Sequence, residues 1–313
     1  MHEFDEPLAL SCHEDITSRP QWRDGLDPTE HRLQQILGDY EFPKALEWAC
    51  GLSTCRQIHQ RGFLVRTEDG LETHIGNVCG VKHFHLVSWE AERSRYRRAK
   101  EDAELRLYLE QALAERDTLA AQARGRIQAL EGLVQQLREV LERLARDPDV
   151  HRVFMEALRA GGAIRKARTL SEEEADSRGL PPGRRTFTET VAQLEGMSAV
   201  QMVARPGAQQ RPWLPSAILL GQLREMLNST LLRFTRERLA ATRVKDRPAL
   251  SAEIRQVRET LAGAATSVED AQRFLAPENL YKLSLLDLRH VSGRAGKVLN
   301  HFARLAQPPG PGD

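Results

Sequence analysis

Two short segments, Cys50-Gly-Leu-Ser-Thr-Cys55 and Cys79-Gly-Val-Lys-His83, decide how the first third of this chain folds. Cysteine and histidine pairs in this arrangement are typical of a closed, tetrahedral zinc site. A bound ion of this kind organises a fold that is too small to have a sizeable core of its own. We therefore expect one structural Zn²⁺, with Cys50, Cys55, Cys79 and His83 as its ligands.

The sequence between the two segments predicts a β-hairpin. Residues 62–66 (GFLVR) and 71–75 (LETHI) are β-prone, and Glu68-Asp69-Gly70 between them favours a tight turn. Cys79 and His83 are four residues apart, so on a helix both side chains leave the same face. A cysteine knuckle, a hairpin and a helix in this order predict a treble-clef-like zinc module.

The fourth ligand has an alternative, because Cys55 and His59 also form a plausible pair. Helical geometry favours His83, and His59 is kept as the alternate ligand. We expect His74 and His85 at the surface. The Cys12-His13 pair lies in the N-terminal segment, where a metal role is not expected. Without a metal, the same residues would be three buried cysteines among scattered histidines.

Residues 50–84 resemble a cysteine/histidine module found in uncharacterised phage and prophage proteins. The shared pattern is C-x-L-x-x-C-x3-H, then Gly-Phe/Tyr-x-Val, an acidic-Gly turn and Ile-Gly-x-x-Cys-Gly before a helix. The resemblance covers about 35 of 313 residues. It implies a metal-binding module and an origin in a mobile element, and it retains His59 as firmly as the cysteines. It implies no activity.

The composition favours long amphipathic helices over one aromatic-rich core, since 41% of the residues are hydrophobic, 28% charged and only 5% aromatic. The formal net charge of +1 combines −7 for residues 1–90 with +8 for the remainder. The basic part is therefore suited to an acidic partner. The sequence predicts no secretory signal and no membrane span. With four cysteines and no export signal, metal binding in a cytoplasmic, reducing environment is expected rather than disulfides.

A single long helix is predicted from about Trp89 to Arg146, with Pro148 ending it. It would extend roughly 85 Å at 1.5 Å per residue. Its apolar residues follow a heptad, which predicts a coiled coil and a homo-oligomer. The alternative is an amphipathic helix packed against the C-terminal half. The heptad residues are Leu105, Leu109, Ala112, Leu119, Ala123, Leu130, Leu133, Leu137, Val140 and Leu144.

The predicted fold is mainly α, and its C-terminal region forms a small helical bundle. Short helices are expected at 29–37, 150–159 and 186–203, and longer ones at 216–243, 249–262 and 278–305. The predicted organisation is a flexible acidic leader (1–28), a zinc-binding module (29–87), a coiled coil (88–147), short helices with a linker (148–215), the bundle (216–306) and a disordered tail (307–313).

Five positive charges follow the zinc module directly. On a helix they spread around the axis and could contact a phosphate backbone without reading sequence. An arginine-rich, solvated start of a coiled coil explains them equally well. The candidate contacts with nucleic acid are Arg93, Arg95, Arg97, Arg98 and Lys100.

The familiar enzyme motifs are absent. Gly293-Arg-Ala-Gly296-Lys297 lacks the preceding strand and the spacing of a phosphate-binding loop. We therefore expect a non-enzymatic, zinc-stabilised adaptor that binds a protein partner, nucleic acid or both. The alternative is a structural or assembly protein of a phage-like particle, with the long helix as its stalk or scaffold.

Overall fold

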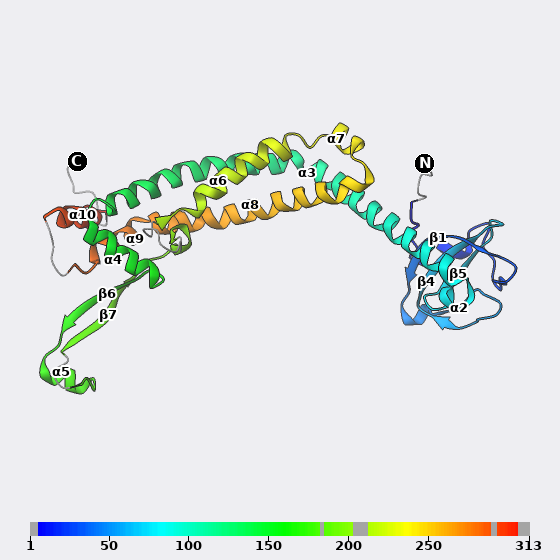
Figure 1. Ribbon diagram of the computed structural model, residues 1–313, viewed down its shortest axis with the longest axis horizontal. Helices are drawn as coiled ribbons and strands as arrows, with labels where there is room; N and C mark the ends of the chain where they lie inside the picture. The colour runs from blue at the N-terminus through cyan, green and yellow to red at the C-terminus, as the bar shows by residue number, and fades with distance from the viewer. Residues whose placement is uncertain (1–5, 182–184, 203–211, 289–292, 306–313) are drawn as a thin grey trace. The chain divides into compact units, whose positions relative to one another are not determined.

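The computed structural model describes residues 6–181, 185–202, 212–288 and 293–305. The chain divides into two compact units, residues 1–112 with 241–251 and residues 113–240 with 252–313. The fold is mainly α-helical with small antiparallel sheets, as predicted (Figure 1). The predicted tail, 307–313, lies outside the described residues. None of the described helices is both long and apolar enough to cross a bilayer.

A three-stranded antiparallel sheet forms the centre of the first unit. Its strands β1 (Leu33–Glu41), β4 (Arg61–Thr67) and β5 (Glu72–Gly76) lie in the order β1-β4-β5. The short strands β2 (Trp48–Ala49) and β3 (Ile58–His59) form a separate pair. The β4–β5 hairpin confirms the two β-prone segments and the turn between them.

The helix predicted for residues 29–37 is wrong, because this part of the chain enters strand β1. Leu33, Ile36 and Leu37 have helical spacing in the sequence. However, the pairing of β1 with β4 has two register irregularities. Ile36 packs in one buried cluster with Cys50, and Leu37 packs in another. A strand buried on both faces imitates the apolar pattern of a helix.

The prediction of a flexible leader is wrong for residues 6–28. This segment contains the short helix α1 (Glu14–Thr17), whose Ile16 is fully buried. Further along, Trp22 and Leu26 form isolated β-bridges with residues 72 and 52. The prolines of the segment prevent a regular strand or long helix. They do not prevent these single backbone bonds to the rest of the unit.

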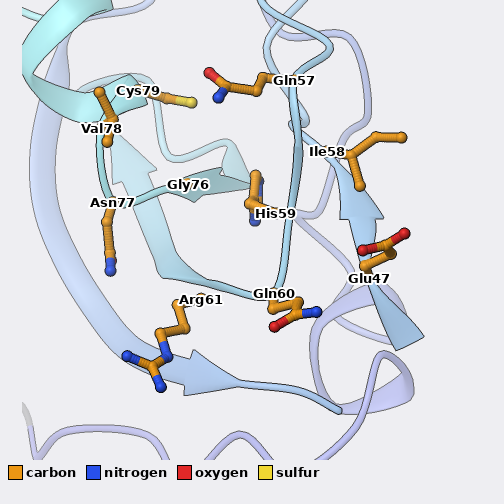
Figure 2. Close-up of a pocket in the computed structure, with 10 residues that line it drawn as sticks. All are labelled: Glu47, Gln57, Ile58, His59, Gln60, Arg61, Gly76, Asn77, Val78 and Cys79. Carbon is orange, nitrogen blue, oxygen red and sulfur yellow. The ribbon is translucent and has the colours of Figure 1, made fainter. Parts of the chain in front are cut away.

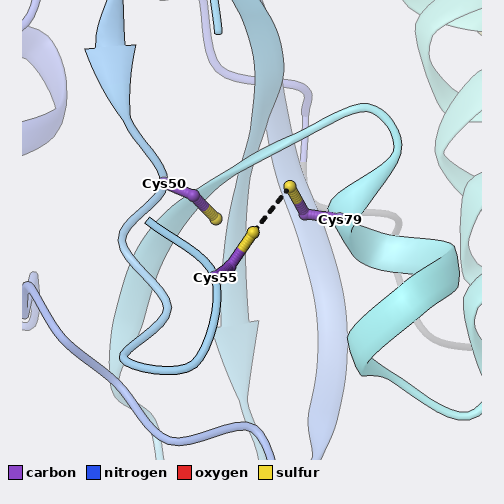
Figure 3. A group of neighbouring side chains, drawn as sticks. All are labelled: Cys50, Cys55 and Cys79. Carbon is purple, nitrogen blue, oxygen red and sulfur yellow. Dashed lines mark hydrogen bonds between the residues drawn. The ribbon is translucent and has the colours of Figure 1, made fainter. Parts of the chain in front are cut away.

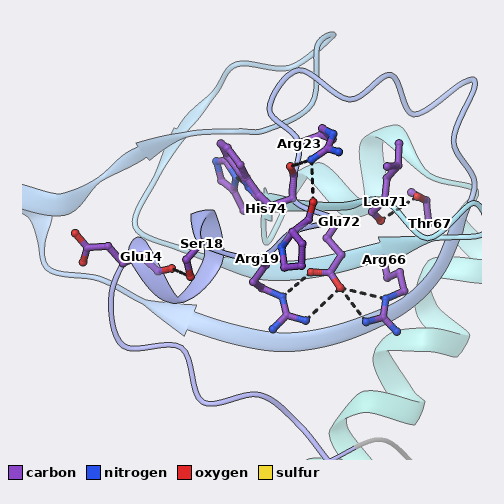
Figure 4. A network of polar contacts seen from close by, with 11 residues as sticks. Glu14, Ser18, Arg19, Arg23, Arg66, Thr67, Leu71, Glu72 and His74 are labelled. Carbon is purple, nitrogen blue, oxygen red and sulfur yellow. Dashed lines mark hydrogen bonds and ion pairs between the residues drawn. The ribbon is translucent and has the colours of Figure 1, made fainter.

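A buried carboxylate joins this segment to the sheet. The side chain of Glu72 is only 1% exposed and accepts from Arg19 at 2.5 Å and from Arg66 at 2.8 Å (Figure 4). Burial alone would raise the pKa of Glu72, but the two guanidinium groups outweigh it and lower the pKa. The ion pairs therefore hold the N-terminal segment against β4 and β5.

The predicted long helix is confirmed as α3, which runs over Leu86–Leu144. It ends shortly before Pro148, as expected. Within the first unit, its early turns pack on the sheet, and Trp89 is fully buried. The hydroxyl of Tyr96 donates to Oδ1 of Asp39 at 2.6 Å. These contacts fix the start of α3 beside the cysteine-rich segments.

In the second unit, helices of the same chain cover the apolar seam of α3. The covering elements are α6 (Pro215–Met226), the π-helical turn Leu227–Leu231 and α8 (Arg247–Leu275). Figure 1 shows α3, α6 and α8 side by side. The apolar seam of α3 therefore packs against the C-terminal half of the same chain, which was the alternative to a coiled coil. A coiled coil between chains that used this seam would displace these contacts. Their shared core includes Leu119, Ala123, Leu130, Leu220, Leu223, Leu227, Val257, Leu261 and Val268.

The helix predicted for residues 186–203 is wrong, because residues 186–193 form strand β7, paired with strand β6 (Ala163–Thr169). Several β-branched residues in this segment (Thr186, Thr188, Thr190 and Val191) favour a strand. The predicted helix at 150–159 is confirmed within α4. The structure also contains α2 (Cys79–His83), α4 (Pro148–Arg159), β6 (Ala163–Thr169), α5 (Glu172–Ser177), β7 (Thr186–Gln193), β8 (Gln201–Met202), β9 (Pro212–Trp213), α7 (Arg236–Ala241), α9 (Pro277–Lys282) and α10 (Gly293–Arg304), with single 3₁₀ turns at Lys44–Leu46, Met197–Ala199, Val244–Asp246 and Leu283–Leu285.

Candidate metal centre

The first cysteine pair lies in a tight loop between strands β2 and β3. The backbone N–H of Cys50 donates to the carbonyl of Gln57 at 2.9 Å, and that of Cys55 donates to the carbonyl of Leu52 at 3.2 Å. Arg56 follows with a φ of 52°, a left-handed conformation that turns the chain back. The loop is tied to β5, because Gly51 donates to the carbonyl of His74 at 2.9 Å.

The third cysteine opens helix α2 and faces this loop. The sulfur atoms of Cys50, Cys55 and Cys79 all lie within 4.8 Å of one another. The sulfurs of Cys55 and Cys79 are 3.4 Å apart (Figure 3). Cys50 and Cys79 are buried in one core cluster, and Cys55 packs against it half-buried. Three of the four predicted ligands are therefore together and could hold a metal ion.

Burial changes the acidity of these thiols. It raises the pKa of Cys79 to about 12, and the neighbouring thiols add to this effect. Burial also raises the pKa of Cys50. For Cys55, burial is outweighed by hydrogen bonds, chiefly from the backbone of Gln57, so its pKa is lowered. A divalent cation among the three sulfurs would stabilise the thiolates that their mutual proximity disfavours.

His59 and His83 lie beside the thiol cluster. Their ring nitrogens are not part of the group of three sulfur atoms that lie within 4.8 Å of one another. His83 approaches Thr54, the residue before Cys55, with its Nδ1 3.4 Å from the Thr54 hydroxyl. Its Nε2 is buried and has no hydrogen-bond partner among the described residues. Burial lowers the pKa of His83, which favours the neutral imidazole that binds metals.

His59 is the second histidine beside the cluster, and it also has a buried ring nitrogen. Its Nε2 is also buried without a hydrogen-bond partner in the described part of the chain, and its Nδ1 lies 3.3 Å from the Tyr40 hydroxyl. A Cβ at Gly76 would lie 2.7 Å from the His59 ring and 3.3 Å from the Cys79 sulfur. Gly76 therefore allows this ring to approach Cys79 closely. The choice between His59 and His83 stays open.

The expectation that His74 is exposed is wrong. The side chain is fully buried and stacks on Trp48 with ring centroids 3.5 Å apart. Its Nε2 lies 2.7 Å from the carbonyl of Ala49. Its neighbours in β5, Thr73 and Ile75, are buried too, so the strand has no solvent-facing side at this position. His85 is exposed, as expected.

Two of the five basic residues predicted to contact nucleic acid are held by carboxylates. Arg95 pairs with Glu92 at 2.6 Å, and Lys100 pairs with Asp39 at 2.7 Å. The Lys100–Asp39 pair and a hydrogen bond from Arg95 to the carbonyl of Ile36 at 3.1 Å connect α3 to strand β1 of the first unit, whereas the Arg95–Glu92 pair lies within α3. Of the remaining three, Arg97 and Arg98 are exposed and Arg93 is half-buried.

A pocket of about 380 Å³ adjoins the cysteine cluster, and the sequence did not predict it. Figure 2 shows His59 and Cys79 among its lining residues, with Ile58 and Val78 at its sides. Ile58 is 62% exposed and Val78 is 68% exposed, which is unusual for large apolar side chains. In the sequence, Ile58 and Val78 are recognisable only as apolar residues next to the candidate ligands His59 and Cys79. This pattern is too common to indicate a pocket.

A scan against protein-family models gave no match for this chain, and searches among curated proteins and solved structures gave none either. The resemblance of residues 50–84 to phage proteins thus stays a prediction. The candidate site is interpreted from its own residues.

Proposed function

We propose that the first unit is a zinc-stabilised recognition module and that the protein is a non-enzymatic adaptor. The observation that carries this proposal is the convergence of three cysteine sulfurs within 4.8 Å. A tetrahedral site with Zn–S bonds of about 2.3 Å places sulfurs roughly 3.8 Å apart, which is compatible with this cluster. A histidine completes the set, and we retain His83 as the preferred ligand and His59 as the alternate.

A structural role for the ion is supported by the burial of the cluster. Cys50 is 0% and Cys79 is 3% exposed, and both belong to a core cluster with Leu52, Ile75 and Trp89. A catalytic zinc keeps one position open for water or substrate. Four protein ligands within this core would close the coordination shell, so the ion would stabilise the module without performing chemistry.

Binding of a protein partner is supported by the apolar surface around the cluster. Ile58 and Val78, which are 62% and 68% exposed, both line the pocket beside Cys79. Exposed apolar side chains grouped around a pocket are typical of surfaces that bind another protein. Nucleic acid is a weaker candidate for this unit, because Arg95 and Lys100 are already paired.

The zinc proposal is tested by elemental analysis of purified variants. We expect one zinc per chain in the wild type and its loss in Cys79→Ser. Cys12→Ser is the matched control, because Cys12 lies outside the cluster, and it should keep its zinc. Loss of zinc in His83→Ala but not in His59→Ala would assign His83, and the opposite result would assign His59. A wild type without zinc, or full zinc in Cys79→Ser, contradicts the proposal.

The adaptor proposal is tested by changing the apolar surface without changing the metal site. In affinity purification, the double variant Ile58→Asp/Val78→Asp should lose a protein that the wild type retains, while its zinc content stays the same. Val191→Asp is the control, since Val191 is 39% exposed on β7 in the second unit. A bound protein retained equally by all three forms would show that this surface is not the docking site.

A further inference from the structure

The second unit contains a pocket whose polar lining is entirely basic. Its volume is about 400 Å³, and Arg143, Arg146, Arg294, Lys297, Val298 and His301 line it. Arg143 and Arg146 come from the end of α3 and the turn after it, and the other four residues come from α10. No acidic side chain is among the lining residues, so four positive charges converge on one concave surface.

The described residues supply no carboxylate partner to these four cations, whereas several other arginines of the second unit have one. Arg224 pairs with Glu131 at 2.5 Å, and Arg258 pairs with Glu115 at 2.8 Å. By contrast, no ion pair within the described ranges involves any of the four cations of the pocket. The repulsion among the four positive charges is energetically unfavourable, and a bound anion would offset it.

The position of the cations on α10 adds to this cost. Arg294 and Lys297 lie in the first turn and the turn that follows it, and no acidic residue occupies the first turn. The N-terminal end of a helix carries a partial positive charge, so cations there are unfavourable and anions are favourable. The start of α10 therefore favours an anion, whereas Arg143 and Arg146 lie at or just beyond the C-terminal end of α3, where the partial charge of the helix is negative.

One lining residue of the pocket, Val298, belongs to the core of the second unit. Val298 packs in the core of the second unit with Leu144, Ala295 and Phe302, all buried. His301 is half-buried. Its pKa is lowered by burial and, to a smaller extent, by Arg143, Arg304 and Arg146. The charged groups that contribute to this shift are all arginines.

We propose that this pocket binds a compact polyphosphate chain. Guanidinium groups match phosphate oxygens with paired hydrogen bonds, and a lysine adds a point charge. A chain of three phosphates carries about as many negative charges as the pocket carries positive ones, and the volume lies within the range of small-ligand sites. No phenylalanine, tyrosine or tryptophan is among the described residues that line the pocket, where His301 supplies the ring. The recognised group is therefore the phosphate chain itself.

The segment Gly293-Arg-Ala-Gly296-Lys297 is part of this site without being a phosphate-binding loop. It lies within a helix, where Arg294 and Lys297 project into the pocket lining. Recognition thus rests on side-chain cations from two helices rather than on a glycine-rich loop. The site does not depend on the proposed zinc module, which is formed by residues of the first unit.

The test is titration calorimetry of the full chain with inorganic tripolyphosphate. Arg146→Gln/Lys297→Gln should weaken binding roughly tenfold or more, since two charge-assisted contacts are lost. Arg124→Gln/Arg126→Gln is the control, because both residues are exposed on α3 about 25 Å along the helix from the pocket. This control should bind as the wild type does. Equal thermal melting curves would establish that all forms are folded.

Adenosine triphosphate distinguishes the source of the phosphate chain. Equal affinity for tripolyphosphate and adenosine triphosphate assigns the site to the phosphates alone, and tighter binding of the nucleotide assigns it to nucleotides. The proposal is overturned if tripolyphosphate does not bind, or if it binds the pocket variant as tightly as the wild type. It is also overturned if only duplex DNA binds through Arg146 and Lys297, because the surface would then be a nucleic-acid interface.

Discussion

Gly80 shows how a single residue sets the geometry beside the cysteine cluster. A Cβ at this position would lie 2.3 Å from the Trp89 ring. Only glycine therefore fits here, where the second residue of α2 lies against the start of α3. The close approach brings Cys79 into the core cluster that contains Trp89. The contact between Gly80 and Trp89 thus helps to fix the position of the third thiol.

His74 makes the stability of the first unit depend on pH. Burial, opposed by the hydrogen bond to Ala49, lowers its pKa from 6.5 to about 4. Between these two values the unfolded chain binds a proton that the folded chain does not bind. The free energy of unfolding should therefore be highest above pH 6.5 and fall by about 3 kcal/mol as the pH drops to 4.

This dependence is measured by urea unfolding between pH 4.5 and 7. His74→Phe keeps a ring against Trp48 but removes the titrating group, so its stability should change less over this range. The difference between the two slopes isolates His74, because the cysteine cluster is common to both proteins. His85→Phe should retain the wild-type slope, since His85 is exposed. Identical slopes for wild type and His74→Phe would contradict the assignment.

At the level of elements, the sequence predicted the helices and strands whose formation depends on residues that are close together in the chain. The β4–β5 hairpin follows from alternation and a glycine turn, and α3 follows from a long stretch without proline. Strand β1 was missed because its apolar spacing fits a helix, and only the pairing with β4 resolves the ambiguity. Strand β7 was missed for a related reason, since it depends on a distant partner, β6.

The candidate site was predictable to the same extent. Spacing alone brought together Cys50, Cys55 and Cys79, which the structure places within 4.8 Å of one another. The fourth ligand was not determined, because His59 and His83 both fit the sequence and both have a buried Nε2. The basic pocket was not predicted, because Arg143 and Lys297 are more than 150 residues apart and meet only in the tertiary fold.

At the level of the whole molecule, the two units are stabilised by different means. The second unit has two large apolar clusters, one formed by α3, α6 and α8 and the other chiefly by α3, α4, α8 and α10. The first unit has smaller clusters, one of which contains the cysteines themselves. Removal of a structural ion should therefore unfold the first unit and leave the helices of the second unit folded.

Hydrogen exchange with and without a strong chelator tests this central claim most directly. After removal of zinc, we expect faster exchange in strands β4 and β5 and in helix α2. Exchange in α6 and in α8 from residue 252 onward should be unchanged, and added zinc should restore the original pattern. Equal protection of β4, β5 and α2 in metal-free and zinc-bound protein would contradict the account, because the three thiols would then be ordinary core residues.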